Sequence, residues 1–195
     1  DDPQVAAHDH EYLSLLSEDE IARHDRFAFE QDRRLFRVAR ALLRTVLSRY
    51  ASIPPSAWQF VTTPRGKLLL AAGTASPPLK FNVSHSGQAT VCAVTLDQEV
   101  GVDVESTARQ ADPRVARYFL APAEMARFSE ADESTRRELF YRYWTLKEAY
   151  AKALGMGLSL RFTEFSFRLD QHAPPTLITS PPGAAATTPW QFHQQ

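Results

Sequence analysis

Two acidic side chains separated by one residue could hold a metal ion. Asp103 and Glu105 close the segment 100–105, Val-Gly-Val-Asp-Val-Glu, in which valines alternate with other residues. The alternation predicts a strand, and residues two apart on a strand project from one face, about 7 Å from each other. Carboxylates at that spacing repel each other unless a cation lies between them, and oxygen ligands favour Mg²⁺ or Mn²⁺ over zinc. An isolated pair of this kind is more commonly a solvated strand face.

A carboxylate and two lysines occur together in the segment 144–152, Trp-Thr-Leu-Lys-Glu-Ala-Tyr-Ala-Lys. If this segment is helical, Trp144, Glu148 and Lys152 share one face. Glu148 could then supply a third metal ligand or a general base, and Lys147 and Lys152 could neutralise a diphosphate. The alternative is an ordinary ion pair between Glu148 and Lys152 on the helix surface.

Hydroxyls and an imidazole precede a glycine in the segment 82–87, Asn-Val-Ser-His-Ser-Gly. Side-chain and backbone donors of this kind at a strand end suit phosphate oxygens. A serine hydrolase is disfavoured because Ser84, His85 and Ser86 are sequence neighbours and no G-x-S-x-G motif is present. His85 could also be a solvated turn residue with no ligand.

The first half contains helical and strand patterns that would position these groups. Ser17 and Glu20 form a capping-box pattern, which predicts a helix ending near Phe29. A longer amphipathic helix follows over 30–50, and we interpret the arginine stripe on one of its faces as mainly solvated, with some members able to reach a phosphate. The stripe consists of Arg33, Arg37, Arg40 and Arg44. Four strand patterns follow, at 58–62, 67–72, 80–85 and 89–96. A loop at 73–78 separates the second from the third, and the last two form a hairpin.

The second half repeats this order of elements in outline. After the strand at 100–105, Pro122 begins a short helix and 136–154 forms a long one that Gly155 and Gly157 end. Two further strand patterns lie at 162–169 and 189–193. Between them is a loop at 174–189 that is rich in Pro, Thr and Ala. The order of elements predicts an α+β fold with two similar α/β subdomains in one chain, 1–99 and 100–195.

Composition excludes several classes of protein. The 195 residues are 44% hydrophobic and 23% charged, as in a globular protein. The net charge of −1 gives no basic field for nucleic acid, and the single cysteine, Cys92, excludes a disulfide framework or a CxxC metal site. No apolar run reaches the roughly 20 residues of a membrane span, and the start lacks a signal-peptide pattern. We therefore expect a cytoplasmic protein without membrane contact.

Taken together, the segments 81–87, 100–105 and 144–152 resemble, in order and spacing, the signature blocks of the Sfp-type 4′-phosphopantetheinyl transferases. Gly66-Lys67 is similar to the family's Gly-Lys-Pro block, with leucine in place of proline, and 32–44 is similar to its first long helix. The resemblance extends from about residue 20 to 170. It implies a pseudo-twofold pair of α/β subdomains, with coenzyme A in the cleft between them. It also implies that the family's last strand, which usually follows a segment like 190–192, is missing.

The resemblance implies a reaction and roles for the acidic residues. Asp103, Glu105 and Glu148 would ligate Mg²⁺, or Mn²⁺, together with the diphosphate of coenzyme A. Glu148 would also deprotonate the carrier serine, directly or through water. The serine oxygen would attack the β-phosphate, and 3′,5′-ADP would leave.

The resemblance also implies contacts for the basic and hydroxyl residues. Lys147 and Lys152 would stabilise the diphosphate or the leaving group. Lys67, Ser84 and His85 would contact the phosphates of coenzyme A. Because Gln31 stands where the family often has a basic residue, the contact to the 3′-phosphate would pass to the residues Arg26 or Arg33.

The implied partners are coenzyme A and apo carrier proteins, whether acyl, peptidyl or aryl, of fatty acid biosynthesis or secondary metabolism. Both subdomains in one chain imply a monomer. Two alternatives remain: a non-catalytic module that binds coenzyme A or a nucleotide phosphate, and a metal-dependent hydrolase or nuclease. The complete set of carboxylates and lysines argues against the first, and the net acidity argues against the second.

Overall fold

The computed structural model describes residues 3–75, 78–108, 112–182 and 189–195. The chain divides into two compact units, Asp1–Val104 and Glu105–Gln195, each with its own hydrophobic core. The first unit thus extends to Val104, whereas the sequence predicts a boundary after residue 99. Both units combine helices with short antiparallel sheets, which confirms the predicted α+β class. None of the helices in the described ranges is long and apolar enough to cross a bilayer.

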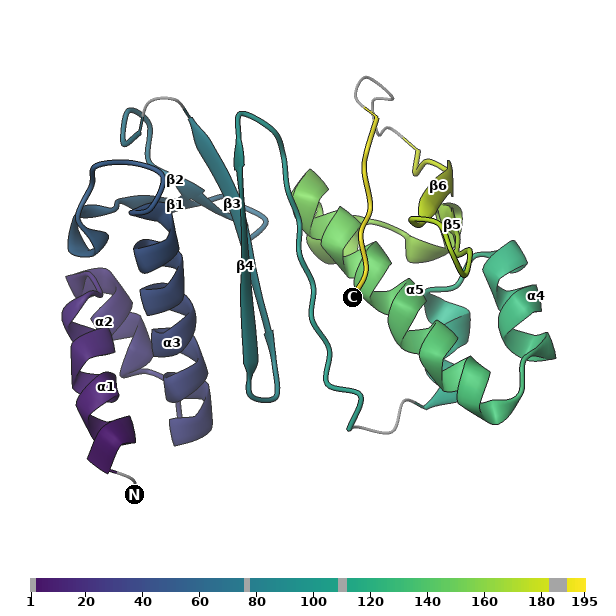
Figure 1. Ribbon diagram of the computed structural model, residues 1–195, viewed down its shortest axis with the longest axis horizontal. Coiled ribbons are helices and arrows are strands. Elements are labelled where there is room, and N and C mark those ends of the chain that lie inside the picture. The colour runs from purple at the N-terminus through teal and green to yellow at the C-terminus, as the bar shows by residue number, and fades with distance from the viewer. Residues whose placement is uncertain (1–2, 76–77, 109–111, 183–188) are drawn as a thin grey trace. The chain divides into compact units, whose positions relative to one another are not determined.

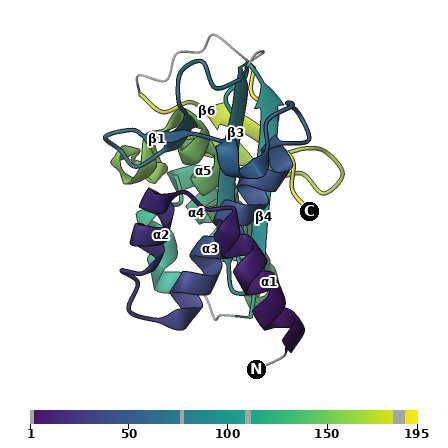
Figure 2. The same ribbon diagram turned by 90° about the vertical axis from the view of Figure 1, so that its left-hand side faces the viewer.

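Three helices form one side of the first unit: α1 (Pro3–Ser14), α2 (Glu18–His24) and α3 (Glu30–Leu47). The predicted capping box begins α2, because Ser17 Oγ accepts from the Glu20 N–H and the Glu20 carboxylate accepts from the Ser17 N–H. This helix ends at His24, earlier than the predicted Phe29. The helix α1 was not predicted from the sequence. Figure 2 looks onto the side that carries all three helices.

Four strands complete the first unit. After the 3₁₀ turn η1 (Pro55–Ala57), β1 (Phe60–Thr62) pairs with β2 (Leu68–Leu70), and β3 (Leu79–Ser86) pairs with β4 (Ala89–Leu96), all antiparallel. The β3–β4 pairing confirms the predicted hairpin. The helix α3 lies between this hairpin and α1 with α2 (Figure 1). The core of the unit comprises Leu43, Leu47, Trp58, Leu79 and Phe81.

The arginine stripe on α3 is not a solvated face. Arg44 is only 1% exposed, and it donates to Glu20 Oε2 at 2.7 Å and to the carbonyls of Pro55, Ser56 and Trp58. Arg37 is also buried and pairs with Asp9 at 2.5 Å. The prediction was wrong because acidic side chains from α1 and α2 neutralise these guanidinium groups, which makes their burial tolerable.

The second unit is built around one long helix. η2 (Pro113–Tyr118) and α4 (Pro122–Glu130) precede α5 (Glu133–Leu154), and η3 (Gly157–Ser159), η4 (Phe162–Glu164), β5 (Ser166–Arg168) and β6 (Thr176–Thr179) follow it. The strands β5 and β6 are antiparallel (Figure 1). The core of the second unit is mainly aromatic, with Phe119, Phe140, Tyr150, Phe165 and Phe167 among its members.

Three strand predictions in or next to this unit fail in part or entirely. The strand predicted over 162–169 is confined to β5, because its start forms η4. No strand occurs over 189–193, and β6 lies within the predicted loop at 174–189. The alternating segment 100–105 has no strand structure either. Parts of the two predicted loops, residues 76–77 and 183–188, lie outside the described residues.

Gly155 ends α5 in the left-handed region, with φ of 65°, and its N–H donates to the carbonyls of Ala151 and Lys152. A side chain in this conformation costs about 1 kcal/mol relative to glycine. We therefore expect Gly155→Ala to lower the free energy of unfolding by about 1 kcal/mol in urea denaturation. Asparagine tolerates the left-handed region, so Gly155→Asn should lose less. Equal losses in the two variants would contradict this explanation.

Candidate active site

A buried hydroxyl holds the first carboxylate of the acidic pair. Ser84 on β3 is 5% exposed, and its hydroxyl donates to Asp103 Oδ1 at 2.9 Å. One residue earlier, the Val102 N–H donates to Asn82 Oδ1 at 2.9 Å. Side chains of β3 therefore fix this segment where the sequence predicted a strand ladder. The strand predicted over 100–105 is wrong, because these hydrogen bonds join the segment to side chains of β3 and the segment has no strand structure.

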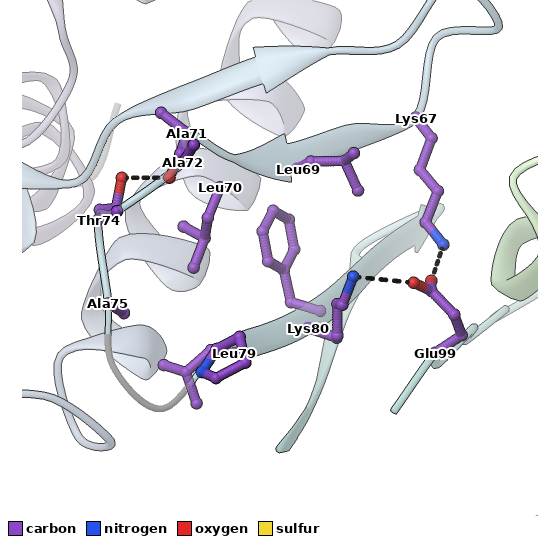
Figure 3. A pocket seen from close by; sticks show the side chains of 13 residues that line it. Lys67, Leu69, Leu70, Ala71, Ala72, Thr74, Ala75, Leu79, Lys80 and Glu99 are labelled. Atoms are coloured by element: carbon purple, nitrogen blue, oxygen red, sulfur yellow. Dashed lines mark hydrogen bonds and ion pairs between the residues drawn. The ribbon is translucent and has the colours of Figure 1, made fainter. Parts of the chain in front are cut away.

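A pocket of about 180 Å³ lies elsewhere in the first unit, lined by β2, the loop after it and the start of β3. Apolar side chains form most of its wall, and Lys67, Lys80 and Glu99 form its polar end (Figure 3). Lys67 Nζ lies 2.6 Å from Glu99 Oε2, and Lys80 Nζ lies 3.1 Å from Glu99 Oε1. The sequence indicates a phosphate contact for Lys67 but none for Lys80 or Glu99, because their proximity depends on the pairing of distant segments.

The other predicted phosphate contacts are dispersed over the first unit. His85 follows Ser84 on β3, and the two-residue period of a strand directs it to the opposite, exposed face. Arg26 is exposed just after α2 and donates to the Ala22 carbonyl at 3.0 Å. Arg33 on α3 pairs with Glu30 at 3.3 Å. The structure therefore brings Ser84 to Asp103, but it does not gather the remaining predicted contacts around them.

An indole in the second unit holds the second carboxylate of the pair. Trp144 Nε1 on α5 donates to Glu105 Oε1 at 3.1 Å. The indole itself makes an edge contact with Phe119, at 5.1 Å between ring centroids, and a tilted contact with Phe162, at 6.0 Å. Glu148 and Lys152 follow Trp144 at intervals of four residues, so they lie on the same helix face, where both are half-buried. Glu105 thus meets the face that carries the predicted catalytic residues.

Lys147 lies about 100° around α5 from Glu148 and points into the core. Its side chain is fully buried, and its ammonium lies 2.8 Å from Glu124 Oε2 and donates to the carbonyls of Phe162 and Phe165 at 2.6 Å. Burial lowers the pKa of Lys147, and the Glu124 carboxylate opposes this shift. An ammonium in this environment has no surface that a diphosphate could reach, so the structure gives Lys147 a structural position and not the predicted phosphate contact.

Comparison with known proteins connects this geometry to a family. Residues 3–97 match the family described as 4′-phosphopantetheinyl transferase, N-terminal, and residues 99–195 match the 4′-phosphopantetheinyl transferase superfamily. The 4′-phosphopantetheinyl transferase HetI of Nostoc sp. is 36% identical over 169 residues, covering 86% of this chain and 71% of HetI. This chain belongs to the 4′-phosphopantetheinyl transferase superfamily.

A second curated relative agrees with this membership. The 4′-phosphopantetheinyl transferase Sfp of Bacillus subtilis is 30% identical over 171 residues, which cover 88% of this chain and 74% of Sfp. The solved holo-[acyl-carrier-protein] synthase of Thermotoga maritima is 34% identical over 42% of this chain and 46% of that chain, with a TM-score of 0.36. The predicted family and the predicted class of enzyme, a 4′-phosphopantetheinyl transferase, are confirmed.

The acidic residues of this transferase fit a hard divalent cation by their chemistry. Asp103 belongs to the first unit, and Glu105 and Glu148 belong to the second. All three offer carboxylate oxygens, and Ser84 and Trp144 donate hydrogen bonds to the first two, as outer groups do to orient metal ligands. Within the described residues, no three His, Cys, Asp or Glu side chains are grouped closely enough to form a metal site.

Sequence reasoning missed the groups that support the predicted site. It placed Trp144 on the same face as Glu148 without giving it a role, and it did not single out Asn82 as the anchor of Val102. The pairing of Glu124 with Lys147 was also missed. Only the indole N–H offered a signal, because a tryptophan next to charged residues on a helix commonly needs a hydrogen-bond acceptor.

Proposed function

We propose that this transferase moves the 4′-phosphopantetheine arm of coenzyme A onto a serine of an apo carrier protein and releases 3′,5′-ADP. The observation that carries the proposal is the hydrogen bond from Trp144 to Glu105, which brings a carboxylate to the helix face of Glu148 and Lys152. Two carboxylates and an ammonium on one surface suit a reaction at a diphosphate, where positioning and charge neutralisation supply most of the catalysis.

The side chains of this chain can account for each step. Glu148 takes the proton of the carrier serine, directly or through water. The serine oxygen forms a bond to the β-phosphorus, the bond from this phosphorus to the bridging oxygen breaks, and 3′,5′-ADP leaves with the bonding electrons. Lys152 neutralises the charge that develops on the leaving group. In this proposal Lys67, Ser84 and His85 bind phosphates of coenzyme A, and Arg26 or Arg33 binds the 3′-phosphate.

The three carboxylates would hold Mg²⁺ or Mn²⁺, which supplies neutralisation of the diphosphate charge. The residues concerned are Asp103, Glu105 and Glu148. Because both family segments occur in one chain, we propose that the enzyme works as a monomer. Its partner would be an acyl, peptidyl or aryl carrier of fatty acid biosynthesis or secondary metabolism.

The decisive experiment incubates the protein with coenzyme A, Mg²⁺ and a panel of apo carrier proteins, followed by intact-mass spectrometry of each carrier. We expect one carrier or more to gain the mass of a single phosphopantetheine arm. The gain should disappear with EDTA and return with excess Mg²⁺, because the diphosphate then regains its counter-charge. Binding of coenzyme A without any gain would favour the non-catalytic module instead, and a gain that is indifferent to EDTA would remove the metal from the proposal.

A further inference from the structure

One carboxylate is shared by two ammonium groups at the polar end of the pocket in the first unit. Figure 3 shows Lys67, which immediately precedes β2, and Lys80, from β3, both pointing toward Glu99. The two contacts, 2.6 Å and 3.1 Å, use different oxygens of the Glu99 carboxylate. The Lys67 side chain is only 12% exposed, whereas those of Lys80 and Glu99 are 36% and 42% exposed. Lys67 therefore holds the inner position of this triad, and Lys80 holds the outer one.

The charges of the triad favour the binding of a phosphate, in addition to the Glu99 carboxylate, only weakly. Partial burial would raise the pKa of Glu99, but hydrogen bonds and charge interactions with Lys67 and Lys80 outweigh this effect and lower it. Glu99 is therefore ionised at neutral pH and cancels one of the two positive charges. A phosphate oxygen that approached the Lys67 ammonium would also approach the Glu99 carboxylate, and two anions near one cation repel each other.

We infer that Glu99 is an affinity-determining residue of the coenzyme A site, because its carboxylate competes with a ligand phosphate for the Lys67 ammonium. Lys80 weakens this competition, because its ammonium binds the same carboxylate. The inference rests on the proposed function, in which Lys67 binds a phosphate of coenzyme A. It adds two residues, Glu99 and Lys80, to the groups that set the affinity for this ligand, and it gives them effects of opposite sign.

Two single substitutions test the opposite signs. Glu99→Gln keeps the shape of the side chain and removes the competing charge, so coenzyme A should bind about twofold to fivefold more tightly, the range of partly exposed ion pairs. Lys80→Met leaves Glu99 with Lys67 as its partner, so binding should weaken by about the same factor. Dissociation constants are measured by isothermal titration calorimetry at low and high salt. Both effects should decrease as salt screens the charges.

Two controls separate local competition from a change in net charge. Glu18→Gln, at an exposed position of α2, makes the same change in net charge and should leave the affinity unchanged. In a Lys67→Met background, Glu99→Gln should lose most of its effect, because the cation for which the two anions compete is absent. Thermal melts of each variant establish that it is folded.

The inference is overturned if Glu99→Gln and Lys80→Met shift the dissociation constant in the same direction, or if neither differs from Glu18→Gln. These outcomes leave carrier modification by the wild type intact, so the proposed function would stand. Failure of the wild type to bind coenzyme A would instead overturn the proposed function, and the inference with it. Opposite shifts that depend on Lys67 would support the inference.

Discussion

Replacing Glu148 with alanine should lower the rate of carrier modification at least about 100-fold while the protein remains folded. A positioned general base contributes about 10² to 10⁴ in rate, and Glu148 would also lose its place among the metal ligands. The side chain is half-buried on α5, so its removal does not open the core of the second unit. Initial rates are measured from the intact mass of a carrier protein at saturating coenzyme A and Mg²⁺.

The same helix offers a matched control for this substitution. Glu138 is another α5 glutamate; its side chain is 64% exposed and pairs with Arg142 at 3.2 Å. Glu138→Ala should keep the full rate, because it removes the same atoms from a surface ion pair worth less than about 1 kcal/mol. Asp103→Ala should behave as Glu148→Ala does. Full activity in either of these two variants would disprove the proposed mechanism, provided that circular dichroism shows native helix content.

Features that depend on neighbouring residues could be predicted from the sequence. The Ser17–Glu20 capping box requires residues three apart, and the end of α5 requires only Gly155. The hairpin of β3 and β4 follows from two alternating runs around a short turn. The family motifs are local in the same sense, which is why three short segments sufficed to identify the enzyme.

Features that depend on contacts between distant segments could not be predicted. Periodicity assigns a residue to a helix face but does not say what covers that face. Arg44 therefore looked solvated, although Glu20 neutralises it from another helix. Lys147 was predicted to stabilise a diphosphate together with Lys152, yet a step of one residue from Glu148 turns a helix by about 100°, and this directs Lys147 into the core. Sequence spacing placed Glu105 beside Asp103 but could not show that Trp144, from the distant helix α5, donates a hydrogen bond to it.

The buried pair of Glu124 and Lys147 should dominate the stability of the second unit. Glu124 is 1% exposed and accepts from the Ala121 N–H at 2.8 Å and the Phe167 N–H at 2.7 Å, besides pairing with Lys147. It thereby joins the start of α4, the strand β5 and the inner side of α5. These partners all belong to the second unit, and burial without a counter-charge would be costly for either group.

Lys147→Met should lower the free energy of unfolding by about 3 to 5 kcal/mol, because it leaves the Glu124 carboxylate buried without its cation. Glu124→Gln in the same chain removes that charge while its amide oxygen can still accept a backbone N–H. The double variant should therefore be more stable than Lys147→Met alone, although it carries one more substitution. Urea denaturation of the wild type, both single variants and the double variant gives the coupling energy. If the losses of the single variants simply add, uncompensated charge is not what destabilises Lys147→Met, and the lost contact of the Lys147 ammonium with the Phe165 ring, 4.4 Å from the ring centroid, would explain its loss instead.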